Sequence, residues 1–544
     1  MIKNYKTLII NKSNILPLVI CLIFLVLQFN IIDYGTNINN IDYISNYKIS
    51  DPDILEKSDT FTLADEKNIV ASPSGIKESK DKWYMRFNLY TVQPEENANI
   101  KALARIKNDP KNLDPAFYAY GGAYLYSLGA WYFVIDKIGI IDIKSFHELL
   151  KVPDNMDEIY ISGRFFVLLL FTLSGLVLFY TISKIANSTY ASLCLILYLA
   201  TPISLLYSVV LKPHFYALFW CNLSLLILCN SLNTKYLSSS MIALLGICVG
   251  MAVGSVITFS LFSLFVGFVL IFFYKRGYVS FNKLSLFIIM ALATFIATNP
   301  YIIVNYEGFA LERSAMKDWF FLSFEPTYLI RFIKNSILPG IGFITGTFFL
   351  LLFAKHIFSG RDFNSKLIPL FLLSCIFFIA VITPSISTWH INYRLIPYFL
   401  PIALIYFAYT YPNKIKLLFL MTILTIFQSI PMHLAFIDEN NPDNSTRIQA
   451  SNWINNNIAL GENICLVSET LSPHEIPPFN FNLFKINESN CSYYVTIEPS
   501  PGYLPHMDNY KLEKRWKPRF FSKSFPTVYG YINPQISVYK STIL

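Results

Sequence analysis

Two pairs of adjacent acids are the residues whose type and spacing most suggest chemistry. Glu95 and Glu96 stand in RFNLYTVQPEENANIKALARI, and Asp65 and Glu66 stand in TLADEKNI. A positioned carboxylate can act as a general base toward a hydroxyl group, which typically contributes about 10²–10⁴-fold in rate. Two neighbouring carboxylates can also contribute to a divalent-cation site. The alternative is that each pair consists of solvated loop acids.

The composition indicates a membrane protein. Of the 544 residues, 54% are hydrophobic and only 14% are charged, whereas a soluble domain has roughly 25% charged residues. Apolar runs of about 18 residues or more recur along the chain, as a multi-span helical membrane protein requires. The net charge of +8 would suit nucleic acid, but the basic residues fall mostly in short loops between the apolar runs. We therefore expect no nucleic-acid partner.

The apolar runs predict about eleven membrane spans. A basic start, MIKNYKTLIINKSN, precedes the first run. That run is long for a signal peptide and has no small-residue cleavage site after it, so we interpret 14–32 as a retained span. The segment 116–141 is predicted to be interfacial, because Tyr and Trp favour the headgroup layer. The other predicted spans are 162–183, 189–210, 213–231, 238–256, 258–274, 284–302, 337–356, 366–384, 395–411 and 415–433.

Loop charges predict the orientation of these spans. The loops on one side hold nine basic residues and a single acid, Asp362, while acids such as Glu307 and Asp318 collect on the other side. Basic loops face the cytoplasm, so we expect the N-terminus inside and the C-terminus outside. Most of the charges of the amphipathic outer segment 303–336 are expected on its surface. The nine basic residues are Lys184, Lys235, Lys275, Arg276, Lys283, Arg361, Lys366, Lys414 and Lys416.

Four regions follow from this division. They are a tail and first span at 1–32, a first outer loop with the acid pair and juxtamembrane helices at 33–161, a helix bundle at 162–433, and an outer α/β domain at 434–544. Within the bundle, Gly246, Gly250 and Gly254 recur every four residues. Small residues at that spacing allow close helix packing, so we assign them no chemistry.

The region after 434 is polar and mixed. It predicts a helix in SNWINNN, strands at ICLV and YYVTI, and β-like alternation in INPQISVYKS. Cys465 and Cys491 both lie in this outer region, where a disulfide is permitted, and the sequence leaves open whether they pair. The other six cysteines lie in predicted spans as small apolar residues. No CxxC, HExxH or glycine-rich phosphate loop occurs.

The order of these features resembles the GT-C superfamily of integral-membrane glycosyltransferases, in particular the bacterial relatives of the protein O-mannosyltransferases and aminoarabinose transferases. The first outer loop of such enzymes carries an acidic pair, usually Asp-Glu, in a setting similar to RFNLYTVQPEENANIKALARI. LDPAFYAYGGAYLY is similar to the aromatic segment that follows in the family. ISGRFFVLLLFTLSGLVLFYTISKI, LKPHFYALFW, ATNPYIIVNYEGF and YRLIPYFLP resemble later segments, in the same order.

The resemblance implies transfer of a sugar from a polyprenyl-phosphate donor to a glycan, lipid or protein acceptor. Glu95 matches the Asp of the family's pair and is the implied general base, while Glu96 orients it or helps to hold a divalent cation. Glu in place of Asp adds one methylene and moves the carboxylate by more than about 1 Å. Asp65 and Glu66 match the Asp-Glu spelling without the flanking resemblance, and they rank second.

Cations at the outer ends of spans are candidates for binding the lipid phosphate. Lys212 could pair with phosphate and His214 could hydrogen-bond the sugar, the alternative being interfacial snorkelling of Lys212. Arg394 follows His390 and Tyr393, and a guanidinium suits phosphate oxygens in a bidentate manner. Interfacial anchoring is the alternative for Arg394.

Two other classes compete with a transferase. A secondary transporter or flippase would be expected to have internal repeats, broken spans and ionisable groups at mid-membrane, and few of these occur. An O-antigen polymerase or ligase would place its large outer loop late in the chain. We therefore predict an α-helical polytopic glycosyltransferase of GT-C type in the bacterial cytoplasmic membrane, with outer juxtamembrane helices and a small C-terminal α/β domain.

Overall fold

The computed structural model of the chain divides into two compact units. Unit 1 contains 1–29, 105–131 and 164–430, and unit 2 contains 30–104, 132–163 and 431–544. The four predicted regions remain a prediction beside this division. The structure describes residues 12–36, 87, 89–108, 113–143, 154–315, 326–358, 368, 372–376, 397–467, 476–487, 491–498, 509–520 and 532–543.

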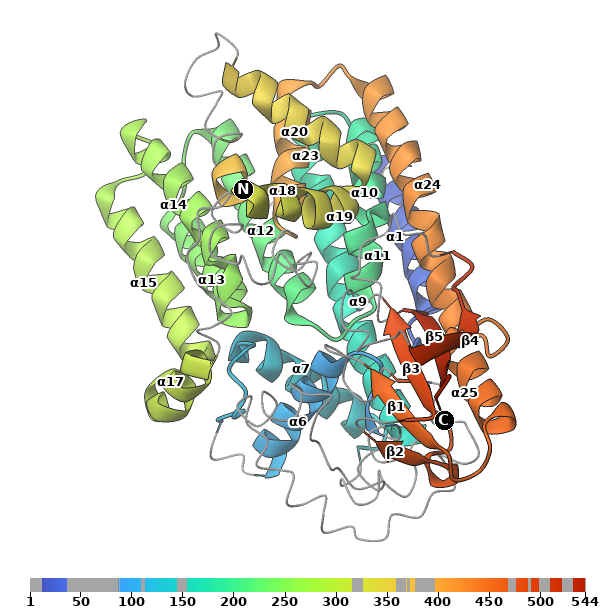
Figure 1. Cartoon of the computed structure of the whole chain (residues 1–544). Helices are drawn as coiled ribbons and strands as arrows, with labels where there is room; N and C mark the ends of the chain where they lie inside the picture. Colours follow the sequence, from blue (N-terminus) through green and yellow to red (C-terminus); the bar gives the residue numbers. More distant parts are fainter. Residues whose placement is uncertain are drawn as a thin grey trace. The chain divides into compact units, whose positions relative to one another are not determined.

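Helices make up the described part of unit 1 (Figure 1). Their sequences are continuous apolar runs with few charges, as in helices that pack in a membrane. Two longer helices, α9 (Asp154–Ser183) and α24 (Ile415–Asn440), extend past the boundaries of this unit, and so does the last part of α7 (Gly122–Lys137). The others are α1 (Lys12–Phe29), α10 (Ser188–Ala200), α11 (Pro202–Ser208), α12 (Pro213–Thr234), α13 (Ser239–Ser255), α14 (Ser260–Lys275), α15 (Phe281–Thr298), α16 (Tyr301–Val304), α17 (Tyr306–Ala315), α18 (Pro326–Phe332), α19 (Leu338–Ile341), α20 (Phe343–Phe358) and α23 (Phe399–Thr410).

The chain is a polytopic helical protein, but the described residues hold fewer full-length spans than predicted. Five helices are long and apolar enough to cross a membrane, and two bent helix pairs raise the number to seven. Three shorter apolar helices, at Ile15–Phe29, Ser239–Ser255 and Phe399–Thr410, coincide with further predicted spans. The predicted span 366–384 lies mostly outside the described residues. The count of eleven therefore stays a prediction.

Two predicted spans are not straight helices. The span predicted at 189–210 is bent by 62° between α10 and α11, at Pro202, which lacks the N–H that would continue the helix. The span predicted at 337–356 is interrupted: the chain turns by 117° before α20, which covers the later part of the predicted range. Gly342 supplies this break with φ 105°, a conformation that favours glycine. Hydropathy alone could not locate either bend.

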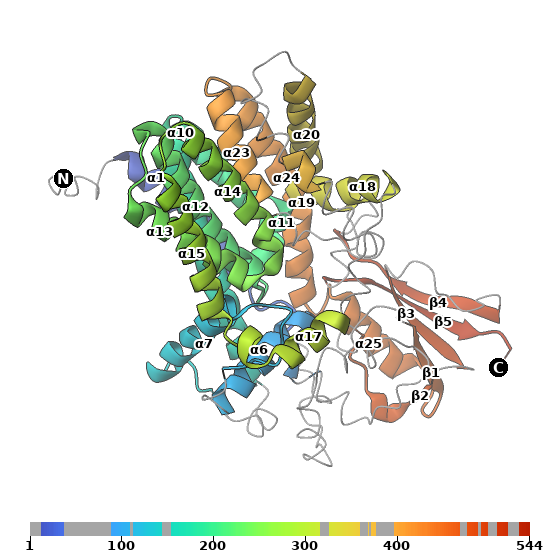
Figure 2. The ribbon, with the colours of Figure 1, turned by 90° about the vertical axis from the view of Figure 1, so that its left-hand side faces the viewer.

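The glycine-lined face of α13 packs against α15, as the four-residue spacing predicted (Figure 2). A Cβ atom at Gly246 would lie 2.8 Å from the carbonyl oxygen of Phe287, and one at Gly250 would lie 2.6 Å from that of Ala291. The two helix backbones therefore approach each other closely at these positions, where a side chain would not fit.

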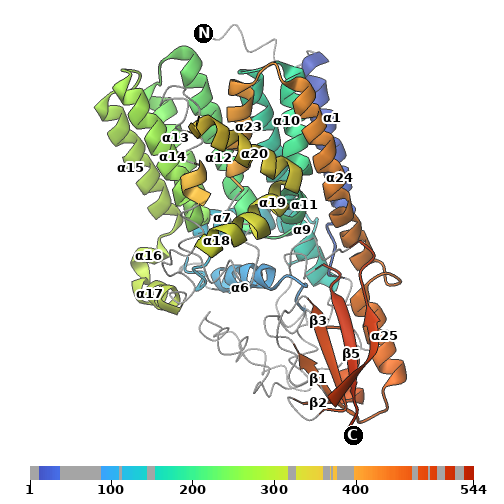
Figure 3. The same cartoon turned by 45° about the horizontal axis from the view of Figure 1, so that its top comes forward.

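A mixed five-stranded sheet forms the core of the C-terminal part of unit 2 (Figure 3). The strand order is β2-β1-β3-β5-β4. β1 pairs in parallel with β2 and β3, while β5 pairs in antiparallel fashion with β3 and β4. The predicted strands β1, β3 and β5 are present, and β2 and β4 were missed. The bounds are β1 (Asn463–Val467), β2 (Lys485–Asn487), β3 (Tyr493–Glu498), β4 (Tyr510–Trp516) and β5 (Gln535–Ser541).

A disulfide, an aromatic contact and an ion pair stabilise this part of unit 2. Cys465 on β1 and Cys491 before β3 form a disulfide, which the sequence had left open. Helix α25 (Thr446–Asn457) was predicted, and it packs on the sheet through its Trp453, whose ring lies edge-on to Trp516 at 5.8 Å. At the end of α24, Glu439 pairs with the fully buried Arg447 of α25 at 2.5 Å. This ion pair ties α25 to the preceding helix.

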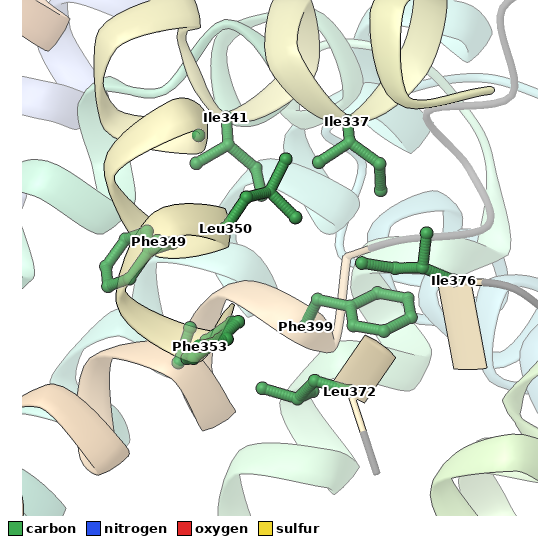
Figure 4. A pocket seen from close by; sticks show the side chains of 10 residues that line it. Ile337, Ile341, Phe349, Leu350, Phe353, Leu372, Ile376 and Phe399 are labelled. Carbon is green, nitrogen blue, oxygen red and sulfur yellow. The ribbon is translucent and has the colours of Figure 1, made fainter. Parts of the chain in front are cut away.

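An apolar pocket lies in unit 1 between α19, α20 and α23 (Figure 4). Every residue that the structure describes around it is apolar, so the pocket offers no group for acid–base chemistry. Its lining consists of Ile337, Ile341, Gly346, Phe349, Leu350, Phe353, Leu372, Ile376, Phe399 and Ala403.

Candidate functional site

The predicted acid pair opens a helix. Helix α6 (Pro94–Asn108) begins at Pro94, and Glu95 and Glu96 occupy its first turn. Proline is suited to this first position because its missing N–H has no partner there in any case. The first turn is also where the helix dipole favours carboxylates. The sequence therefore places both acids at a helix start for local reasons.

The two acids have different surroundings. Glu96 is fully buried, whereas Glu95 is half-buried. The hydroxyl of Thr91 donates a 2.6 Å hydrogen bond to Oε2 of Glu96, and it accepts a 3.1 Å hydrogen bond from the backbone N–H of Gln93. Thr91 therefore fixes both the carboxylate of Glu96 and the turn that enters α6. Glu95 is the more accessible acid of the pair.

Contacts within unit 2 hold the segment that carries the pair. The ring of Phe87 stacks on Phe481 with centroids 5.5 Å apart. The hydroxyl of Tyr160 donates a 2.9 Å hydrogen bond to the carbonyl oxygen of Leu89. Val92 is fully buried and packs closely on Gly35. A Cβ atom added at Gly35 would lie 2.4 Å from the side chain of Val92. The acid pair thus sits on an anchored part of the chain.

Lys212 and His214 lie at the start of α12, within unit 1. Lys212 is the N-cap residue and is 9% exposed, while His214 is 2% exposed. The Nζ atom of Lys212 lies 5.5 Å from the ring centroid of Tyr207. The rings of Tyr120 and Tyr207 lie 6.0 and 5.9 Å from that of His214. A cation and a helix N-terminus at one place can bind an anion.

A second acidic centre, which the sequence analysis missed, surrounds Asp114 in unit 1. Its Oδ2 atom accepts hydrogen bonds from the Tyr118 hydroxyl at 2.8 Å and from Nδ2 of Asn305 at 2.6 Å. Its Oδ1 atom accepts one from the backbone N–H of Ala116 at 2.9 Å. Burial and the bond to Asp114 together raise the pKa of Tyr118 above its usual value. The hydroxyl therefore stays protonated and continues to donate.

Charged side chains also hold the backbone of this segment. The carboxylate of Glu312 accepts a 2.8 Å hydrogen bond from the N–H of Tyr118, and Arg313 donates one of 2.9 Å to its carbonyl oxygen. Arg105 donates a 2.9 Å bond to the carbonyl oxygen of Ala116. Burial lowers the pKa of Arg313, although the neighbouring Glu312 opposes this effect. Most charges in 303–336 are expected on the surface, and Glu312, which is only 8% exposed, is an exception.

These residues had a signal in the sequence, but it was a weak one. Asp114 stands in LDPAFYAYGG, beside the aromatic residues of the segment, and Asp before Pro is a common turn element. Glu312 and Arg313 stand almost two hundred residues later. No spacing rule connects positions that far apart, so the cluster could be found only in the folded chain.

The predicted site residues fall into three groups. Glu95 and Glu96 belong to unit 2, and Lys212 and His214 belong to unit 1. The second-choice acids Asp65 and Glu66, together with His390, Tyr393 and Arg394, lie outside the described residues. Within the described part of the chain, no group of three or more His, Cys, Asp or Glu residues could hold a metal ion.

When the chain is compared with known proteins, only solved structures match it. No protein-family model matches the chain, and no curated protein matches it. ArnT from Cupriavidus metallidurans bound to undecaprenyl phosphate is 10% identical, with a TM-score of 0.43, over 84% of this chain and 95% of ArnT. The Archaeoglobus fulgidus oligosaccharyltransferase in complex with zinc and sulfate is 14% identical, with a TM-score of 0.34, over 73% of this chain and 62% of that chain.

The chain is structurally similar to both proteins. At these identities the likeness concerns the fold alone.

Proposed function

We propose that the chain is a GT-C-type membrane glycosyltransferase that moves a sugar from a polyprenyl-phosphate donor to an acceptor on the outer face of the cytoplasmic membrane. One observation carries the proposal: a buried carboxylate, Glu96, is held by Thr91 beside a half-buried carboxylate, Glu95, in the first turn of α6. A solvated loop pair would have neither the burial nor the fixed donor. The segment that carries the pair is the one that resembles the family's acidic loop.

Glu95 and Glu96 have different roles in the proposed reaction. The acceptor hydroxyl attacks the anomeric carbon, and Glu95 takes the proton that the hydroxyl loses. The bond between the anomeric carbon and the phosphate oxygen breaks, and the polyprenyl phosphate leaves with the electron pair. A single displacement of this kind inverts the anomeric carbon. Glu96 acts as a positioning residue, since its own carboxylate is already held by Thr91.

The developing charge on the leaving phosphate requires fixed cations. Lys212 and the N-terminus of α12 would supply positive potential, and the aromatic rings around Lys212 and His214 would keep water away. Arg394, with His390 and Tyr393, remains a sequence-based candidate for the same task. A divalent cation at Glu95 and Glu96 would also fit, because Mg²⁺ needs only one or two carboxylates beside its waters. The steps written here do not depend on it.

The decisive experiment follows release of polyprenyl phosphate by purified protein in lipid. The donors are a panel of polyprenyl-phosphate sugars, and the acceptor is a crude envelope fraction. We expect Glu95→Gln to abolish release, while Glu158→Gln, at an exposed acid of α9, leaves release unchanged. Loss in Glu66→Gln instead would move the site to the other acid pair. No release from any donor, with solute flux in its place, would indicate a transporter.

A further inference from the structure

Strand β4 concentrates positive charge at one edge of the C-terminal sheet. Among the described strands it pairs with β5 alone, so it lies at the end of the strand order (Figure 2). Seven of the nine Lys and Arg residues after Pro431 fall between Lys511 and Lys540, and Glu513 is the one acid in that stretch. The acids of the region lie elsewhere. The part of the chain after Pro431 has nearly equal numbers of acidic and basic residues, but its basic residues are concentrated between Lys511 and Lys540.

The register of the sheet brings three lysines to one face. Lys511 lies opposite Lys540, and Lys514 lies opposite Val538, because a bulge at Glu513 shifts the register by one residue. Opposed residues, and residues two apart along a strand, share a face. Lys511, Lys514 and Lys540 are all exposed. Like charges directly opposite each other destabilise a sheet, and a bound anion would relieve that repulsion.

We propose that β4 and the exposed end of β5 bind an extended anionic glycan, a sugar chain that carries carboxylate or phosphate groups. On β4 the cations run from Lys511 to Arg515, about 13 Å at the rise of a strand. That length suits a polymer better than a single ion. Because β4 is the last of the described strands, its outer edge presents backbone N–H and C=O groups that can hydrogen-bond sugar hydroxyls. Arg515 keeps its guanidinium beside β5 by donating to Ser537 and Tyr539.

A membrane surface fits this edge less well than a glycan does. Binding to lipid usually combines cations with several inserted apolar side chains. On β4 the one large hydrophobic side chain that is well exposed is Leu512, at 41%. The remaining rings here, Trp516 among them, are buried or half-buried. Such a surface can attract anions but has little to insert into a bilayer.

Edge lysines can also serve simply to prevent strands of different molecules from pairing. A reversal of charge separates the two roles, because glutamate also prevents such pairing but repels an anion. The pair Lys511→Glu with Lys514→Glu is therefore the test variant, and Lys511→Arg with Lys514→Arg preserves the charge. Lys485→Glu is the matched control, since Lys485 is an exposed lysine of β2 at the opposite edge of the same sheet.

The experiment measures binding of the full chain, in neutral phosphatidylcholine nanodiscs, to polygalacturonate, dextran phosphate and uncharged dextran. We expect binding to at least one anionic polymer, none to dextran, and a loss on raising the salt concentration. The double Glu variant should bind about tenfold more weakly or worse, since it replaces two attractive charges by two repulsive ones. Lys485→Glu and the double Arg variant should bind as the parent does.

Equal binding by the double Glu variant and the parent, with both folded by circular dichroism, would overturn the proposal. Binding to nanodiscs of anionic phospholipid without binding to either polymer would overturn it in favour of a membrane contact. The anionic glycan would be the acceptor of the sugar transfer, and this assignment rests on the proposed function. The binding measurement uses no donor and no turnover, so failure of the transfer assay and failure of this proposal can be told apart.

Discussion

The Thr91 hydroxyl and the Glu96 carboxylate form a 2.6 Å hydrogen bond between two buried side chains. A hydrogen bond to an ionised carboxylate is about twice as strong as one between neutral groups. It joins the turn before α6 to the first turn of the helix itself. The position of the acid pair therefore depends on a residue that carries no charge.

Removal of that hydroxyl tests the arrangement. We expect Thr91→Val to reduce release of polyprenyl phosphate by about tenfold or more, because a buried carboxylate without its donor costs about 1–3 kcal/mol and would move. Thermal unfolding and initial rates, measured on the same preparation, separate the two effects. Thr91→Ser retains the hydroxyl and should restore the rate. A fully active Thr91→Val would contradict the positioning role of Glu96.

Asp114 should be important for stability. We expect Asp114→Asn to lower the unfolding temperature by several degrees, because an amide has one oxygen acceptor where the carboxylate accepts three hydrogen bonds, and each lost bond costs about 1 kcal/mol. Differential scanning fluorimetry in detergent measures this shift. Glu307→Gln is the control, since Glu307 is an exposed acid of α17. Equal shifts in the two variants would argue against the network.

Gly121, the residue directly before α7, should not accept a side chain. A Cβ at Gly121 would lie 1.9 Å from the carbonyl oxygen of Gly254, so we expect Gly121→Ala to displace α7 and greatly reduce the yield of folded protein. At Gly267, in α14, nothing lies within 4 Å of the added atom, and Ala is the better helix former. Size-exclusion profiles of the two variants should therefore differ. Similar profiles would show that the close approach is not required.

The disulfide should stabilise the sheet. Cys465 and Cys491 are 26 residues apart, and closing a loop of that length stabilises by about 3–4 kcal/mol in the chain-entropy model. We expect Cys465→Ser with Cys491→Ser, or treatment with a reductant, to lower the unfolding temperature of the parent protein. Labelling of free thiols under denaturing conditions provides the check. Labelling of Cys465 and Cys491 without reductant would exclude the bond.

The buried ion pair at the end of α24 should be costly to break. We expect Glu439→Gln to destabilise the protein by about 3–5 kcal/mol, because it leaves the fully buried Arg447 without a counter-charge. Asp443→Asn, at an exposed acid of the following turn, should have little effect. Unfolding followed by intrinsic fluorescence can report on Trp453, which lies on α25. A small effect of Glu439→Gln would mean that water reaches Arg447.

Local patterns in the sequence were sufficient to predict much of this protein. Apolar runs identified a polytopic helical chain, because this signal depends on neighbouring residues. β1, β3 and β5 were predicted because each has apolar or alternating residues. The exposed and charged β4 lacks that pattern, and it is held in the sheet through its pairing with β5. No local signal could have revealed it.

Tertiary structure decided which polar groups became buried. Glu96 and Glu95 are adjacent and chemically identical, yet Glu96 is fully buried and bonded to Thr91, whereas Glu95 is half-buried. Asp114 and Glu312 form one cluster only because the fold brings α17 to a segment almost two hundred residues earlier. Residue type determined the available chemistry. Burial and hydrogen bonding, which depend on distant parts of the chain, determined which groups were positioned to use it.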